Sequence, residues 1–280
     1  MILSSDATAI HHWPGRGRPI LYVHGATFPA ALSVGYRFAG RSWADDLQAG
    51  GHDVWAFDFA GYARSAPPGD GGRAPEAAAQ IARVVAHVRA TTGRDRVAIV
   101  AHSWGTIAAG RFAADHPEAV DRLVLFGPIA QRQTASPGPI QRWREITLAD
   151  QLARFVEDVP PGHPPVLLEP DLAQWGPAWL ATDPQAKDRN PPAVRVPGGP
   201  AADIQAAWSG DLAYDPARVT ALALIIRGAW DSVTTGDDAA WLHRRLGACA
   251  GDVVIPEATH LMHLERGRDA LFAATANFLS

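Results

Sequence analysis

The sequence has almost no cysteine and no long apolar run, and each of these shortages excludes a class of protein. Its 280 residues include one cysteine, Cys249, so neither an internal disulfide nor a cysteine-rich zinc site can form. A run of about 18 uncharged apolar residues, which a transmembrane helix needs, does not occur. The first residues lack a basic segment followed by an apolar one, so we expect no signal peptide and a cytoplasmic location.

An excess of one charge is lacking as well. Lysine and arginine together number 25 against 29 for aspartate and glutamate, a formal net charge of −4, and the basic residues form no block. Such a chain has no electrostatic footprint for nucleic acid or an anionic membrane, so we expect a small-molecule partner. With 47% hydrophobic and 19% charged residues, the chain has the composition of a soluble globular protein that buries its core without a metal or disulfide.

What the sequence does contain is an alternation of short apolar runs with helical patterns. This alternation favours an α/β fold with a mostly parallel central sheet, because helices connect parallel strands across both faces of a sheet. We expect strands over residues 19–24, 53–59, 97–102, 122–126, 221–227 and 252–255, and helices over 75–90, 104–115 and 265–279.

The alternation stops between about residues 130 and 218. This stretch holds most of the prolines and many of the aromatic residues. A loop of this length without structure of its own is unusual in a compact domain. We therefore expect a mainly helical insertion over 130–218, with the core of the protein made of residues 1–129 and 219–280.

Ser103 stands between the expected strand 97–102 and the helix that follows, within the pentapeptide AHSWG. The small residues Ala101 and Gly105 leave room for a sharp turn from which the serine side chain projects. This is the setting of a nucleophile elbow, whose usual pattern is G-x-S-x-G, with Ala101 in place of the first glycine. The alternative is a chance S-x-G, which is common in any sequence.

A serine hydroxyl is a weak nucleophile and needs a base that a carboxylate orients. Asp231 follows one expected strand and His260 follows the last, so both can reach the sheet edge where such sites form. Asp231 could instead cap a helix near Asp237, although Asp237 or Asp238 is better placed for that role. His260, His263 and Glu265 could suggest a metal site, but no further strong ligand accompanies them, so we expect no metal.

Five motifs, taken together, resemble a known family. They are His24-Gly25 after a strand, DFAGYARS from Asp58 to Ser65, AHSWG around Ser103, IIRGAWD ending at Asp231, and ATHLMHLE around His260. The chain thus resembles an α/β-hydrolase-fold serine hydrolase of the capped esterase, lactonase and C–C hydrolase type. Three positions depart from the family pattern without removing a catalytic group: Ala63 and Ala101 where glycine is usual, and Thr106 where many relatives have a second glycine.

The resemblance implies a catalytic triad of Ser103, Asp231 and His260 that needs no cofactor. It also implies an oxyanion hole formed by the backbone N–H groups of Ala26 and Trp104. His24 and Asp58 would then be structural. Epoxide hydrolases and dehalogenases carry an aspartate at the nucleophile position, so Ser103 argues against both.

Two regions are candidates for substrate contacts. The long loop after His24 contains Phe28, Tyr36 and Arg37, and Arg37 could hold a carboxylate or carbonyl group. The alternative, that Arg37 is only an exposed charge and that Phe28 only anchors the loop, is equally open. In the insertion, which resembles the family's cap, aromatic side chains could roof an apolar pocket or only pack. These are Trp143, Trp175, Trp179 and Trp208.

The function that these residues favour is acyl transfer to water from an ester, lactone or thioester of small to medium size and largely apolar character. A C–C bond hydrolase would use the same triad, and a cyclase or a ligand receptor can share the scaffold. Fold alone does not choose between these functions. The sequence leaves the oligomeric state open.

Overall fold

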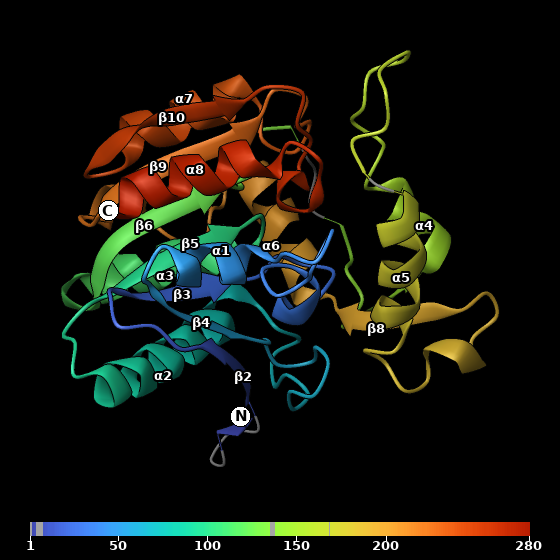
Figure 1. Ribbon diagram of the computed structural model, residues 1–280, viewed down its shortest axis with the longest axis horizontal. Helices are drawn as coiled ribbons and strands as arrows, with labels where there is room; N and C mark the ends of the chain where they lie inside the picture. Colours follow the sequence, from blue (N-terminus) through green and yellow to red (C-terminus); the bar gives the residue numbers. More distant parts are fainter. Residues whose placement is uncertain (1, 4–7, 135–137, 168) are drawn as a thin grey trace.

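The computed structural model describes residues 2–3, 8–134, 138–167 and 169–280, and a single main sheet organises it. The strand order is β1-β2-β4-β3-β5-β6-β9-β10 (Figure 1). The parallel strands are β3 (Pro19–Val23), β4 (Asp53–Phe57), β5 (Val97–His102), β6 (Val120–Phe126), β9 (Leu222–Gly228) and β10 (Cys249–Ile255). At one edge, β1 (Ile2–Leu3) and β2 (Thr8–Trp13) run antiparallel to their neighbours. The expected α/β fold is therefore confirmed.

Helices cover both faces of this sheet. The alternation of side chains along β3 places Leu21 and Val23 in one apolar cluster and Ile20 and Tyr22 in another. The first cluster also holds side chains of α2 (Ala74–Thr92), α3 (Gly105–Asp115) and α7 (Gly236–Arg245). The second holds side chains of α1 (Trp43–Ala49) and α8 (Arg268–Leu279). The main sheet is thus buried between two helical layers.

The chain leaves the main sheet between β6 and β9, which pair directly with each other. This intervening part contains β7 (Trp143–Thr147), α4 (Leu148–Ala153), α5 (Glu169–Leu180), β8 (Ala193–Pro197) and α6 (Gly199–Trp208). Figure 1 shows α4, α5 and β8 beside the main sheet. β7 and β8 form a small antiparallel sheet of their own, which the expectation of a mainly helical segment did not include.

Several boundaries differ from the sequence-based expectations by one to three residues, and three of these differences accompany a local feature of the structure. The last helix begins at Arg268 rather than at residue 265, because Met262–Leu264 form a separate 3-10 turn. β10 begins at Cys249, three residues before the expected start, with an irregular register between Cys249 and Gly251. β4 ends at Phe57, since the backbone N–H of Asp58 turns to the carbonyl of Ala9. None of the described helices is both long and apolar enough to cross a lipid bilayer.

Two tryptophans attach the intervening part to the core. The indole N–H of Trp175 donates to the carbonyl of Leu32 at 3.0 Å, and that of Trp179 donates to the carbonyl of Thr27 at 3.1 Å. Both side chains are fully buried. Phe28 meets the Trp175 ring edge-on at 5.3 Å between centroids, so the loop after β3 and helix α5 share one aromatic contact.

Candidate active site

Ser103 lies at the turn between β5 and α3 in a backbone conformation that most residues avoid. Its φ is +55°, which costs free energy in any residue but glycine and persists only where the surroundings enforce it. Gly105 explains the tightness of the turn, because a Cβ at that position would lie 2.4 Å from the carbonyl oxygen of His24. The serine is therefore held at the tip of a strained strand-to-helix turn.

The structure brings Ser103, His260 and Asp231 together at the carboxyl edge of the sheet. His260 Nε2 lies 2.8 Å from Ser103 Oγ, and His260 Nδ1 lies 3.0 Å from Asp231 Oδ2. In the tautomer that fits these contacts, Nδ1–H donates to Asp231 and Nε2 accepts from the serine hydroxyl. Ser103 follows β5, Asp231 follows β9 and His260 follows β10, and all three are buried.

Asp231 is fixed in this place by backbone donors. Its Oδ1 accepts from the N–H groups of Val233 at 2.9 Å and Thr234 at 2.8 Å. The alternative role, capping the following helix, falls to other residues, because Thr235 and Asp238 form a capping box at the start of α7. Asp231 is therefore left to orient His260.

The loop that carries His260 is held from two sides. His102, buried beside Ser103, donates from Nε2 to the backbone carbonyl of His260 at 3.1 Å. On the other side, the buried carboxyl of Glu265 bonds the backbone N–H of Thr259 at 3.2 Å and also its hydroxyl. Burial raises the pKa of Glu265 to about 7, although the bonds from Thr259 lower it.

Replacing Glu265 by glutamine is expected to flatten the pH dependence of stability. The native pKa is about 7 against an ordinary value of 4.5, so the folded state holds this proton more tightly. The resulting stabilisation is complete below pH 4.5 and is lost as the pH rises through 7. Urea unfolding of wild type should lose on the order of 3 kcal/mol across this window relative to Glu265→Gln.

Glu257→Gln is the matched control for this measurement, because Glu257 is an exposed carboxylate in the same loop. Its variant should follow the wild-type pH profile. Parallel profiles for wild type and Glu265→Gln would contradict the raised pKa of Glu265.

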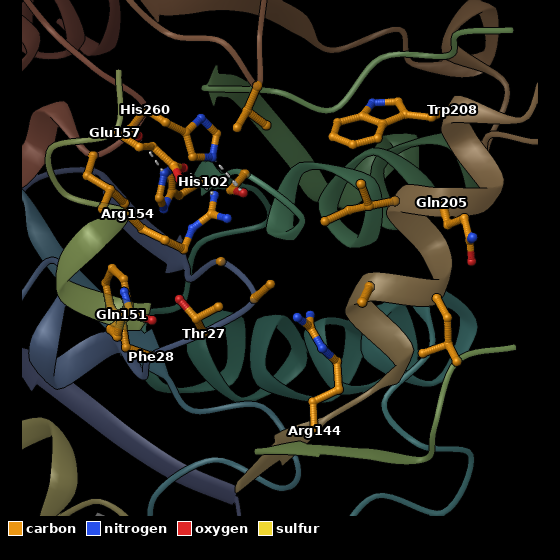
Figure 2. Close-up of a pocket in the computed structure, with 18 of the residues that line it drawn as sticks. Thr27, Phe28, His102, Arg144, Gln151, Arg154, Glu157, Gln205, Trp208 and His260 are labelled. Carbon is orange, nitrogen blue, oxygen red and sulfur yellow. Dashed lines mark hydrogen bonds and ion pairs between the residues drawn. The ribbon is translucent and has the colours of Figure 1, made fainter. Parts of the chain in front are cut away.

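Ser103 and His260 border a cavity of about 730 Å³. One wall is the segment from Gly25 to Phe28, and the opposite walls come from the part of the chain between β6 and β9 (Figure 2). The residues from that part are Pro139, Ile140, Gln141, Arg144, Gln151, Arg154, Glu157, Ala201, Ile204, Gln205 and Trp208. This volume suits a small-molecule substrate.

The two backbone amides expected at an oxyanion hole lie close to Ser103. Trp104 directly precedes α3, so its N–H is among the helix-start donors that have no acceptor within the helix. Ala26 lines the cavity next to Gly25, where an added Cβ would lie 3.2 Å from the Cβ of Ser103. Within the described residues, no hydrogen bond from either amide is found. Both are thus available to a substrate oxygen.

Phe28 and Trp208 line the cavity, as expected, and Trp208 directs its indole into it (Figure 2). Tyr36 and Arg37 lie outside it, which corrects their assignment as substrate contacts. The Arg37 side chain is 62% exposed and forms an ion pair with Asp45 at 2.8 Å, because the loop carries it towards α1. The Tyr36 ring packs edge-on against Phe38, 4.7 Å between centroids.

The other three tryptophans also lie outside the cavity. Trp175 and Trp179 are buried anchors, since their N–H groups are taken up by carbonyls of the loop after β3. Trp143 is not among the residues that line the cavity, and the guanidinium of Arg195 lies over its ring, 5.0 Å from the centroid. Of the two roles left open for these three tryptophans, roofing the pocket is therefore wrong, and packing is the role that their contacts show.

The charged and amide side chains of the cavity wall were missed by the sequence analysis. They are Gln141, Arg144, Gln151, Arg154, Glu157 and Gln205. No motif marks them, because isolated arginines and glutamines are normal on any exposed strand or helix. Only the placement of β7, α4 and α6 around the cavity distinguishes them.

The remaining histidines near the site have other partners. His24 Nε2 accepts from the N–H of Phe59 at 3.0 Å, and burial lowers the pKa of His24 to about 4. His263 Nε2 bonds Ser33 Oγ at 2.9 Å, away from Ser103. Asp58 accepts from the N–H of Ala30 at 2.9 Å.

Among the residues that the structure describes, no cluster of three histidine, cysteine or acidic side chains could hold a metal ion.

Asp203 connects the α6 wall of the cavity to the turn that carries Ser103. Its buried carboxylate accepts from the Trp104 indole N–H at 2.9 Å and from the backbone N–H of Ala74, at the start of α2, at 2.7 Å. It also pairs with Arg73 at 2.5 Å. The cavity wall is thereby held in a fixed position relative to Ser103.

Comparison with known proteins gives one family and several structural neighbours. The family model described as alpha/beta hydrolase fold matches residues 18–267. No curated protein matches the sequence significantly.

Among solved structures, an esterase from Exiguobacterium antarcticum has a TM-score of 0.68 at 17% identity, covering 99% of this chain and 97% of that one. A serine hydrolase involved in carbazole degradation has a TM-score of 0.68 at 20% identity, covering 96% and 93%. The thioesterase domain from the curacin biosynthetic pathway has a TM-score of 0.66 at 16% identity, covering 100% and 97%. At these identities the likeness concerns the fold alone.

Proposed function

The chain belongs to the α/β-hydrolase fold family, and from this premise we propose that it is a serine hydrolase that transfers an acyl group to water. The observation that carries the proposal is the pair of hydrogen bonds on His260. One joins its Nε2 to Ser103 Oγ at 2.8 Å, and the other joins its Nδ1 to Asp231 at 3.0 Å. A serine, a histidine and a carboxylate in this order form a nucleophile with its base and its orienting group.

In the proposed reaction, Ser103 Oγ attacks the substrate carbonyl while its proton passes to His260 Nε2. Asp231 stabilises the imidazolium, and the amides of Ala26 and Trp104 stabilise the oxyanion. Collapse of the tetrahedral intermediate gives an acyl-serine and expels the alcohol or thiol, which takes the proton from His260. Water then attacks the acyl-serine with His260 again as base, and the acid is released.

The proposed substrate is an ester, lactone or thioester of small to medium size. We assign residues 130–218 as a cap over a core made of 1–129 and 219–280. The support is that side chains of β7, α4 and α6 form the walls opposite Ser103, so the cap limits what fits. In an apolar pocket such limits discriminate by about 1–3 kcal/mol per methylene group.

Labelling with a fluorophosphonate probe tests this proposal directly. We expect one label per chain, on Ser103, because only a serine with an adjacent base reacts rapidly with such a probe. Ser103→Ala should remove the label. Ser232→Ala, which changes an exposed serine next to Asp231, should keep it. Labelling of a different serine, or no labelling at all, would overturn the assignment of the nucleophile.

A substrate panel separates this function from its alternatives. Turnover of p-nitrophenyl esters, lactones or acyl thioesters supports acyl transfer. A labelled Ser103 without turnover of any of them would redirect the assignment to C–C bond cleavage, or to a cyclase or receptor on the same scaffold.

A further inference from the structure

Arg144 places a positive charge inside the cavity that Ser103 borders. It lies on β7, and its guanidinium points into the cavity (Figure 2). Its neighbours along the strand have partners elsewhere: Trp143 packs against Arg195, and Glu145 pairs with Arg189 at 3.2 Å. Arg144 is thus the residue of this strand segment that faces the substrate space.

The other arginines around Arg144 have partners, whereas Arg144 has no hydrogen bond or ion pair to any residue that the structure describes. Arg132 pairs with Asp238, Arg142 donates to the carbonyls of Pro68 and Gly69, Arg154 pairs with Glu157, and Arg189 pairs with Asp183. The guanidinium of Arg195, on the neighbouring strand, also has no ion pair among the described residues, but it lies outside the cavity, over the Trp143 ring. An unpaired guanidinium at the cavity itself indicates a ligand that supplies the anion.

The remaining charges of the cavity do not neutralise Arg144. Glu157 is the one carboxylate among the described lining residues, and it already pairs with Arg154 at 3.5 Å. His102 carries no charge near neutral pH, because burial holds its pKa well below the ordinary value. Asp231 is buried behind His260. The cavity therefore favours an anion, although the chain as a whole has a net charge of −4.

Two further observations concern the surroundings of the Arg144 guanidinium, and the second points to a ligand. The positive charge of Arg144 acts on the pKa of Tyr62, lowering it against the larger effect of burial, and the Tyr62 hydroxyl donates to the carbonyl of Ala26 at 2.5 Å. Arg144 thus stands near the loop that borders the nucleophile. On the same cavity, the buried side chain of Gln151 has no hydrogen-bond partner for either amide atom within the described residues. A buried amide without a partner is costly unless a ligand satisfies it.

We propose that the substrate carries a carboxylate that Arg144 binds while the reacting carbonyl sits at Ser103, so that the enzyme acts on monoesters or monothioesters of short dicarboxylic acids. This inference rests on the proposed function and names its substrate class. The guanidinium offers two parallel N–H donors that match the two oxygens of a carboxylate. Arg144 is accordingly a specificity residue and takes no part in the bond changes at the carbonyl.

A pair of substrates that differ only at the distal end tests the proposal. Mono-p-nitrophenyl adipate ends in a carboxylate, and p-nitrophenyl hexanoate ends in a methyl group at the same chain length. Wild type should prefer the adipate monoester. Arg144→Gln should lower kcat/KM for that substrate by about 10- to 100-fold and for the hexanoate by less than about threefold, since the loss is that of one charge-assisted contact.

Arg195→Gln is the matched control, because it removes the same charge from the same small sheet but outside the cavity. It should leave the ratio of the two kcat/KM values unchanged, and Arg144→Lys should retain part of it. The proposal is overturned if Arg144→Gln leaves the ratio at its wild-type value.

A binding measurement keeps the inference separate from the proposed chemistry. Calorimetry on Ser103→Ala should detect monomethyl adipate more strongly than methyl hexanoate, and the added change Arg144→Gln should remove the difference. If this difference is seen but wild type hydrolyses neither nitrophenyl substrate, the serine hydrolase proposal fails and carboxylate binding stands. Equal binding of both compounds with and without Arg144 would overturn the inference, whether or not esters are hydrolysed.

Discussion

Replacing Ser103 by alanine is expected to lower kcat/KM for any ester that the enzyme turns over by about 10⁴- to 10⁶-fold. The change removes the atom that forms the acyl-enzyme in the proposed reaction, which is also the partner of His260 Nε2 at 2.8 Å. It leaves the cavity and the two amides of the proposed oxyanion hole in place. These account for the small rate that should remain above the reaction in water.

The structural cost of the same change should be small. The Ser103 side chain is at the cavity, so alanine leaves no enclosed void, and both residues face the same backbone strain at φ +55°. We expect the free energy of unfolding in urea to stay within about 1 kcal/mol of wild type, the size of one hydrogen bond. A Ser103→Ala enzyme that folds normally and keeps more than a tenth of wild-type activity would contradict the covalent mechanism.

The positions of Ser103, Asp231 and His260 at one edge of the sheet could be predicted, because each residue follows a strand that is recognisable from its local sequence pattern. Ser103 is flanked by a strongly apolar strand and a helix, and Asp231 and His260 each follow an apolar run. Parallel strands end at one edge of a sheet, so residues that follow them in sequence meet there in space. The geometry that unites these three residues therefore follows from strand ends and requires no knowledge of distant contacts.

Strand β2 and helix α1 were missed for different reasons. Residues Thr8–Trp13 include His11 and His12, which look unsuited to a strand until Asp58 and Asp53 are seen to bond them at 3.1 and 2.7 Å. Those partners are distant in sequence. Helix α1, by contrast, carries a readable signal, because Ser42 and Asp45 form a capping box at its start.

The cavity wall could not be predicted because tertiary contacts decide which side chains reach it. Arg37 and Arg144 are equally plausible in the sequence, yet the first ends on α1 and the second in the cavity. What separates them is the attachment of the part between β6 and β9 to the loop after β3 through Trp175 and Trp179. These tryptophans stand out in the sequence, but the sequence does not reveal that they anchor this part of the chain and that polar neighbours line the cavity instead.

The roles of the two histidines in the last loop are expected to separate clearly by mutation. His260→Ala should lower kcat/KM by about 10⁴- to 10⁶-fold, because no other base lies within reach of Ser103 Oγ among the described residues. His263→Ala should keep kcat/KM within about tenfold of wild type. The measurement is steady-state hydrolysis of a nitrophenyl ester by both variants, with urea unfolding alongside.

His263 is unsuited to act as the base for reasons of chemistry as well as position. Burial, together with the charge of His260, lowers the pKa of His263 to about 3, and a general base works best when its pKa lies near the working pH. Its Nε2 instead bonds Ser33 Oγ at 2.9 Å, and Ser33 bonds the buried hydroxyl of Tyr22 at 2.5 Å. Removing His263 takes away the third member of this buried chain and leaves the two hydroxyls with only each other as partners, so His263→Ala should cost about 1–3 kcal/mol of stability while His260→Ala costs mainly activity. Equal losses of activity in the two variants would show that His263 shares the work of the base and would overturn the assignment of His260 alone.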